Sequence, residues 1–231
     1  MNNSTQSQKV DFTKQLPFKI ENILKLVFCA ISFISLFYSK IILIGLLSGL
    51  AACMMGLIRQ IGPVKFTKDY LAAFIRNDFG NTLFYIALLF LVQGPNIIFS
   101  FPVMLFFAIG LGELALRSDL KFLKSEWVQA KANVVVAYKN DIKVSRCVVE
   151  LLLFFYSIIL LFMSRIGVMY PIMMFNYLRI RGMANQVCNQ TFNLVKNKIL
   201  GKLNGFALPG MSILIKVVNF FFGLLINAPG N

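Results

Sequence analysis

A long uncharged stretch that is interrupted near its middle constrains the fold of this chain more than any other feature. Residues 82–112 contain no Asp, Glu, Lys or Arg, and residues 93–96 (QGPN) separate a short apolar run from a longer one that contains Pro102. A straight membrane span needs about 20 apolar residues, whereas about 10–14 are typical of re-entrant or interfacial segments. Gly and Asn tolerate unusual backbone angles, and Pro cannot continue a helix. We therefore expect a helical hairpin that enters the membrane, turns at Gly94, Pro95 and Asn96, and leaves on the side it entered.

Composition places the chain among membrane proteins. Apolar residues make up 58% of its 231 residues and the mean hydropathy is +0.75, whereas soluble domains contain about 45–50% apolar residues. The 23 Lys and Arg residues against nine Asp and Glu give a net charge of +14. Basic membrane proteins hold such charge against anionic lipid headgroups, so we expect an anionic bilayer as a partner. No basic-aromatic module or zinc pattern supports nucleic-acid binding.

Residue types that carry catalytic or metal chemistry are few. The four cysteines (Cys29, Cys53, Cys147 and Cys188) are scattered without a C-x-x-C, and the chain has no His. Thiols inside apolar runs usually act as small hydrophobes, so we expect no disulfide, no metal and no cofactor. No nucleophile–base pair or phosphate-binding loop is visible, which argues against an enzyme.

Two further hairpins flank the central one. Leu26–Tyr38 and Ile41–Leu57 are apolar and are separated only by Ser39 and Lys40. Val148–Met163 and Val168–Leu178 form the third pair, although a single span over residues 148–178 stays open as an alternative. Its turn is expected at Arg165 and Gly167.

Small side chains recur at helical spacing on the second arm of the first hairpin. In membranes, such stripes let two helices approach closely, so we expect helix packing along this face. The residues concerned are Gly45, Ser48, Gly49, Ala52 and Gly56.

Amphipathic helices are expected between and after the hairpins. Residues 64–78 and 117–146 mix charged and apolar residues at helical spacing, as do two tail segments within 183–231. Such helices lie in the headgroup plane with the apolar face down. The residues expected at the membrane interface are Phe66, Phe74, Phe192, Val195, Ile199, Lys216, Phe220, Phe221 and Phe222.

These expectations give an all-α polytopic membrane protein with three short transmembrane helical hairpins plus interfacial amphipathic helices. Its parts are a polar, cytosolic N-terminus (1–23), a hairpin domain (24–182) and a membrane-binding tail (183–231). Glu113 and Glu150 stand at the edges of apolar runs, where a carboxylate is expected to reach the headgroups rather than to act as an intramembrane functional group.

The distribution of charge predicts the topology. If each hairpin returns to its starting side, only Lys40 and Arg165 lie at the far side, and the other 21 (23 − 2) basic residues share the near side. Basic residues near spans favour the cytosol, so both termini are expected there. Asn189-Gln190-Thr191 is a formal glycosylation acceptor that would report the opposite orientation.

Two segments resemble a known family. The stretch FTKDYLAAFIRNDFGNTLFYIALLFLVQGPNIIFSFPVMLF, with Asp78, Phe84-Tyr85 and residues 101–105 (FPVML), is similar to the transmembrane protein 33 family of endoplasmic-reticulum and nuclear-envelope proteins. Its fungal members are called pore-membrane proteins. Residues 170–181 (YPIMMFNYLRIR), followed by Phe192, carry a second match. The likeness covers about residues 24–203.

The resemblance implies a non-enzymatic role in organising endoplasmic-reticulum tubules, the nuclear envelope and nuclear pores. It also implies partners among reticulon-type or pore-complex membrane proteins. Hairpins and in-plane helices that occupy more of one leaflet than the other would favour positive curvature. A small multi-pass transporter or channel subunit or regulator is the alternative, and homo-oligomerisation stays open.

Overall fold

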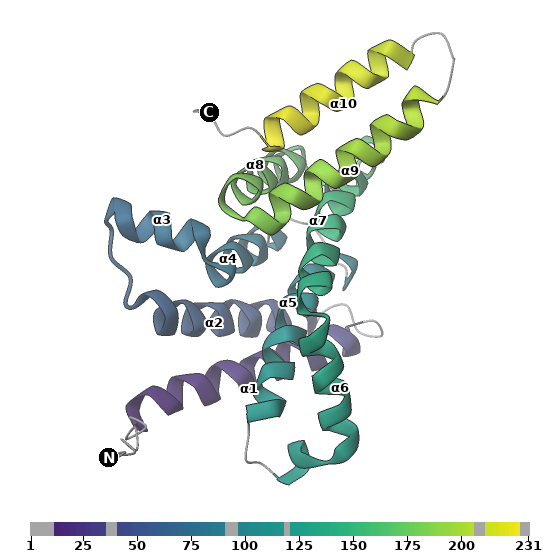
Figure 1. Ribbon diagram of the computed structural model, residues 1–231. Coiled ribbons are helices and arrows are strands. Elements are labelled where there is room, and N and C mark those ends of the chain that lie inside the picture. The colour runs from purple at the N-terminus through teal and green to yellow at the C-terminus, as the bar shows by residue number, and fades with distance from the viewer. Residues whose placement is uncertain (1–11, 36–40, 91–96, 118–120, 206–210, 227–231) are drawn as a thin grey trace, which may run out of the picture.

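The computed structural model describes residues 12–35, 41–90, 97–117, 121–205 and 211–226, and every regular element in these ranges is helical (Figure 1). Ten α-helices and one 3₁₀ turn follow one another along them. They are α1 (Phe12–Ile34), α2 (Ile42–Ile61), α3 (Lys68–Arg76), α4 (Asp78–Leu89), α5 (Ile97–Arg117), η2 (Lys121–Lys124), α6 (Glu126–Ala137), α7 (Lys139–Phe162), α8 (Met169–Ala184), α9 (Gln186–Asn204) and α10 (Met211–Ile226). The all-helical fold class is therefore confirmed.

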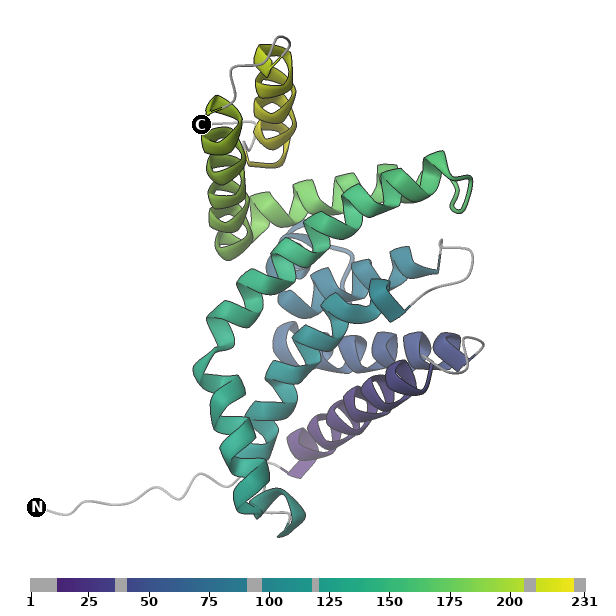
Figure 2. The ribbon, with the colours of Figure 1, turned by 90° about the vertical axis from the view of Figure 1, so that its right-hand side faces the viewer.

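Three pairs of consecutive helices, α1–α2, α4–α5 and α7–α8, form hairpins that stack side by side and share one end of the molecule (Figure 2). We call this end the tip end: α1, α4 and α7 end there, and α2, α5 and α8 begin there. The opposite end, which carries α3, α6 and α9, is called the charged end. The turn residues Ser39, Lys40, Gly94, Pro95 and Asn96 lie outside the described residues. Arg165 and Gly167 are exposed in the connection between α7 and α8, so these helices form a hairpin rather than a single span.

The two arms of a hairpin differ in length. Three described helices, α2, α5 and α7, are long and apolar enough to cross a membrane. α4 has 12 residues, which at 1.5 Å per residue is about 18 Å and falls short of a hydrocarbon core of about 30 Å. α5 is longer than expected, because it runs through Pro102 to Arg117. α7 begins nine residues before the expected start of its arm at Val148, because the charged residues from Lys139 onward continue the same helix.

The stripe of small residues on α2 lies against α1 and α4. Gly45, Ser48, Gly49, Ala52 and Gly56 are all buried. A Cβ added at Gly49 would lie 2.7 Å from the ring of Phe28 on α1, and one added at Gly56 would meet the ring of Phe79 on α4. Larger side chains would therefore push both neighbours away from α2.

Aromatic side chains fill the space between the hairpins. Phe28 of α1 meets Phe107 of α5 edge to face with ring centroids 5.2 Å apart. The hydroxyl of Tyr85 on α4 donates to the carbonyl of Phe99 on α5 at 2.8 Å. The same ring lies 5.4 Å from that of Tyr177 on α8. This aromatic core joins all three hairpins into one body.

The N-terminal boundary differs from the expectation. α1 begins at Phe12, so the polar segment assigned to residues 1–23 is helical over its second half. The reason is that Glu21, Asn22 and Lys25 turn inward and are buried. Glu21 pairs with Lys25 one turn on and with Arg59 of α2, whose Nε lies 2.9 Å from the carboxylate. Residues 1–11 lie outside the described part of the chain.

Candidate functional site

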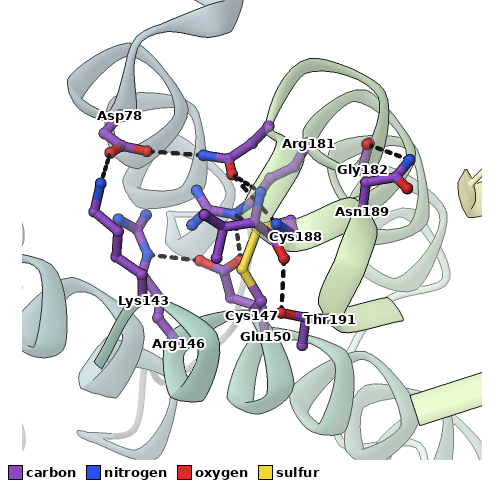
Figure 3. The surroundings of a disulfide bond; sticks show 12 residues. Asp78, Lys143, Arg146, Cys147, Glu150, Arg181, Gly182, Cys188, Asn189 and Thr191 are labelled. Atoms are coloured by element: carbon purple, nitrogen blue, oxygen red, sulfur yellow. Dashed lines mark hydrogen bonds and ion pairs between the residues drawn. A yellow bond between two sulfur atoms is a disulfide. The ribbon is translucent and has the colours of Figure 1, made fainter. Parts of the chain in front are cut away.

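A buried cluster of charged side chains joins α7 to α8 (Figure 3). Glu150 is fully buried, and its Oε1 accepts from Nε of Arg146 at 2.9 Å and from the hydroxyl of Tyr177 at 3.0 Å. Its other oxygen lies 2.8 Å from Nε of Arg181. The expectation that Glu150 reaches the headgroups is wrong, because α7 starts at Lys139 and so places Glu150 in mid-helix beneath α8.

The cluster continues from α7 to α4 and α9. Nη2 of Arg146 donates to Oγ1 of Thr82 on α4 at 2.8 Å. Asp78, the first residue of α4, lies 3.3 Å from Nζ of Lys143 and accepts from the side-chain amide of Asn185 at 3.1 Å. Asn185 also caps α9, because its Oδ1 accepts from the backbone N–H groups of Val187 and Cys188. One charged network therefore fixes the orientation of four helices.

A disulfide stands beside the charged cluster and corrects the expectation that the cysteines stay unpaired. Cys147 of α7 is bonded to Cys188 of α9, with Cα atoms 5.6 Å apart and a separation of 41 positions in the sequence. Both are almost fully buried, and Nε of Arg181 lies 3.2 Å from Sγ of Cys188. No spacing motif signals this pair, since only the packing of α9 on α7 brings the two cysteines together. Cys29 and Cys53 are free.

The charged cluster has a structural role, because its charged groups pair with one another. Each charged member has an opposite charge within 3.3 Å, and the cavity beside it measures only about 10 Å³, which is about the room for one water molecule. Glu113, by contrast, is one-third exposed and pairs with Lys139 at 2.5 Å near the charged end. A buried charge in a membrane helix bundle is costly unless it is paired. The ion pairs of Glu150 therefore join α7 and α8. The start of α9 is held in place by the hydrogen bond from Asn185 to Asp78 and by the Cys147–Cys188 disulfide.

The sequence offered a partial signal for this cluster. Arg146 and Glu150 stand four residues apart at the start of an apolar run, the spacing at which two helix side chains meet. Arg181, Tyr177 and Asp78 were missed as members, because the sequence does not say which helices pack together.

The expected membrane-interface residues divide between two environments. In the connection before α3, Phe66 is fully exposed, whereas Phe74 of α3 packs partly against the core. On α9, Phe192 is completely buried, and Val195 and Ile199 also pack on the core. The apolar stripe of α9 therefore contacts the protein rather than lipid, because α7, α8 and α10 cover it.

The last helix, α10, has one face on the protein and one face free. Phe222 is 1% exposed and Phe221 stacks on Phe154 of α7 with ring centroids 5.5 Å apart, so neither is at the surface as expected. Phe220 and Lys216 are exposed. They share their side of the helix with three exposed apolar residues, Ile213, Leu214 and Val217.

The tail helices lie across the direction of the hairpins. In Figure 2, α9 and α10 run across the direction of the stacked hairpin helices, and α10 is the one nearer to the tip end. Apart from Leu194, the exposed positions of α9 are mostly polar, and they include Gln190 and Asn197. The more apolar helix, α10, thus lies nearer to the tip end than α9. This is the arrangement expected of a helix pair that lies at a membrane surface with its apolar helix toward the hydrocarbon.

Comparison with known proteins places the chain in a family. The family model described as Transmembrane protein 33/Nucleoporin POM33 matches residues 4–227. No curated protein matches significantly, and neither does any solved structure. Because the family match covers nearly the whole chain and the fold is a helical bundle with three helices able to cross a membrane, this protein is a member of the Transmembrane protein 33/Nucleoporin POM33 family of non-catalytic endoplasmic-reticulum and nuclear-envelope membrane proteins.

Proposed function

We propose that the protein shapes or organises curved membrane in the endoplasmic reticulum and nuclear envelope, including sites of nuclear pore insertion. The observation that carries the proposal is the unequal distribution of helices between the two ends of the molecule. α3, α6 and the α9–α10 pair lie toward the charged end or across it, and the described residues at the tip end are helix ends and the connection between α7 and α8 (Figure 2).

This distribution supports a wedge. A protein that occupies more area in one leaflet than in the other expands that leaflet, so the membrane becomes convex on that side. The short α4 strengthens the difference, since a helix of about 18 Å ends before it reaches the far side of the hydrocarbon core. Exposed apolar side chains on the helices outside the hairpins, such as Trp127 of α6 (71% exposed) and Phe220 of α10 (69%), supply surfaces that insert among lipids.

The orientation belongs to the same proposal. With both termini in the cytosol, the crowded charged end faces the cytosolic leaflet, where anionic lipids attract Lys and Arg. Curvature toward the cytosol is that of a tubule or of the rim of a pore. In this role the protein scaffolds other membrane proteins, of the reticulon type or of the pore complex, rather than transforming a substrate.

Reconstitution tests the proposal. The purified protein in liposomes of phosphatidylcholine, phosphatidylethanolamine and phosphatidylserine should produce tubules in electron micrographs, at a protein density at which empty liposomes stay round. The triple variant I213D/V217D/F220D should tubulate less, because three carboxylates replace exposed apolar side chains of α10.

A matched control separates insertion from charge. The variant Q190D/N197D/N204D adds the same three negative charges to exposed polar positions of α9 and should tubulate like the wild type. Round liposomes with the wild-type protein at every density would contradict the proposal. Equal losses in both triple variants would contradict the role assigned to α10.

A further inference from the structure

A second cavity, much larger than the one beside the disulfide, opens at the charged end. It measures about 520 Å³ and lies among the charged-end portions of α1, α2, α3, α4, α5 and α7. Its volume falls in the usual range of about 300–1,000 Å³ for small-molecule sites. The charged cluster around Glu150 does not use this cavity, apart from Asp78 and Lys143 at its edge.

The lining of this cleft is strongly basic. Five cationic side chains face two carboxylates, Asp78 and Glu113, which leaves a surplus of three positive charges (5 − 2). The cationic residues are Lys25, Arg59, Arg76, Lys139 and Lys143. Even with the buried Glu21 counted beside Lys25 and Arg59, the surplus is two.

The cationic groups keep donors available. Arg76, at the end of α3, is exposed and has no carboxylate within 4 Å among the described residues. Lys139 has a single ion-pair partner, Glu113, and three donor hydrogens. Arg59 pairs through Nε and Nη2 with Glu21, which leaves Nη1. A surplus of cationic donors around an enclosed volume is the chemistry that binds phosphate.

The apolar part of the lining distinguishes a lipid from a free anion. Phe18, Phe79, Phe106 and Ile109 line the cleft together with the basic groups. α2, α5 and α7 are the helices able to cross a membrane, and each contributes residues near its charged end. A ligand here would meet both cationic groups and aromatic rings in one cleft.

We propose that this cleft is a binding site for a phospholipid whose headgroup carries a phosphomonoester. Such a headgroup bears about −1.5 to −2 on the monoester at neutral pH and one further charge on the diester, which is opposite in sign and similar in size to the surplus of two to three positive charges in the lining. The phosphomonoester lies between Arg76 and Lys139, and the glycerol and first acyl carbons lie against Phe79 and Phe106. The cleft therefore recognises one class of lipid specifically. This binding function is independent of the proposed membrane shaping.

Binding of short-chain lipids to the full-length protein in detergent tests the site. Dioctanoyl phosphatidylinositol 4-phosphate is titrated against the wild type and against R76Q/K139Q, with dioctanoyl phosphatidylcholine as the neutral lipid. The variant K68Q/K131Q removes the same two charges from exposed positions outside the cleft and is the matched control. Inositol 1,4-bisphosphate and inorganic phosphate, titrated separately, distinguish a lipid from a soluble phosphate.

The expected result is saturable binding of the phosphoinositide that R76Q/K139Q weakens about tenfold or more, the change that corresponds to about 1.4 kcal/mol. K68Q/K131Q should bind like the wild type, and the two soluble phosphates and the neutral lipid should bind far more weakly. Equal weakening in both double variants would overturn the site. Equal affinity for inorganic phosphate would overturn its assignment to a lipid. If R76Q/K139Q does not fold, the single variant R76Q decides, because Arg76 is exposed and has no carboxylate partner in the described part of the chain. Unchanged binding by R76Q would overturn the proposal.

Discussion

Glu150 shows how one buried carboxylate can determine the arrangement of several helices. It neutralises Arg146 of its own helix and Arg181 of the next, and it accepts the hydroxyl of Tyr177. Ion pairs at a surface contribute little to stability because water screens them. A buried pair behaves differently, since removing one partner leaves the other charge without compensation.

Replacement of Glu150 by Gln should therefore strongly lower the free energy of unfolding. E150Q leaves two buried guanidinium groups facing an amide, and we expect a loss of about 3–5 kcal/mol in the free energy of unfolding. E113Q removes a carboxylate that is one-third exposed and should cost less than about 1 kcal/mol. Unfolding of the detergent-solubilised variants, followed by circular dichroism, compares the two. Similar small losses would mean that the cluster does not hold the helices.

The Cys147–Cys188 disulfide provides a second prediction for single residues. The disulfide joins α7 and α9 through cysteines that are 41 positions apart in the sequence. It should contribute about 2–4 kcal/mol to the free energy of unfolding. Reductant should therefore lower the melting temperature of the wild type and leave that of C147A/C188A unchanged. The variant C29A/C53A, which lacks only the free cysteines, should respond to reductant like the wild type. A melting temperature insensitive to reductant in all three proteins would contradict a stabilising disulfide.

Among elements, the hairpins were the easiest to predict from sequence and the helix partners the hardest. Gly-Pro-Asn and Ser-Lys interrupt apolar runs, so the existence of three hairpins follows from length and turn chemistry. The start of α1 falls in the segment predicted as a polar N-terminus, which contains Glu21, and the start of α7 falls in the segment predicted as a separate amphipathic helix, which ends at Arg146. In the structure Glu21, Lys25 and Arg146 form buried ion pairs, whereas Lys139 pairs with the partly exposed Glu113.

The tail shows a different limit. An amphipathic pattern predicts that one face is covered, but it does not say whether lipid or protein covers it. Phe192 of α9 and Phe222 of α10 were assigned to lipid and lie inside the protein. Only the second, outward set of apolar residues on α10, which includes Phe220, keeps the expected exposure.

Helix α2 gives a prediction for a whole element. G49A places a methyl group against Phe28 and Ile86, so we expect it to destabilise the contacts of α2 with α1 and α4 by about 1–3 kcal/mol. Gly201 is exposed on α9 with no atom within 4 Å of an added Cβ. The control G201A should therefore stabilise its helix by about 0.5–1 kcal/mol. Thermal unfolding should show shifts of opposite sign, and two shifts of the same sign would contradict close packing at Gly49.

At the scale of the whole molecule, the charged end and the tip end differ in their residues, and we propose that they face opposite sides of the membrane. The acceptor motif at Asn189 is a poor reporter of this topology, because Thr191 is buried in α9 and Asn189 bonds to the carbonyls of Gly182 and Ile226. Exposed positions at opposite ends are better reporters, and Lys68 and Met163 are both exposed.

Cysteine labelling should show the orientation of the ends. In a C29A/C53A background in sealed microsomes, K68C should react with an impermeant maleimide added outside, whereas M163C should react only after detergent opens the vesicles. The reason is the excess of Lys and Arg at the charged end, which favours the cytosol. Prompt labelling of M163C in sealed vesicles, with K68C protected, would reverse the proposed orientation.

The stacking of three hairpins with their tips together also bears on how the chain enters the bilayer. In the topology that we propose, each hairpin returns to its starting side, so its insertion carries only a short connection across the membrane. Lys40 and Arg165 are the charged residues that the sequence places in the three connections, and a charge costs about 2.5–3.5 kcal/mol at the bilayer centre on insertion scales. The protein can therefore be integrated one hairpin at a time, with the apolar arms of each pair driving the entry of their own turn.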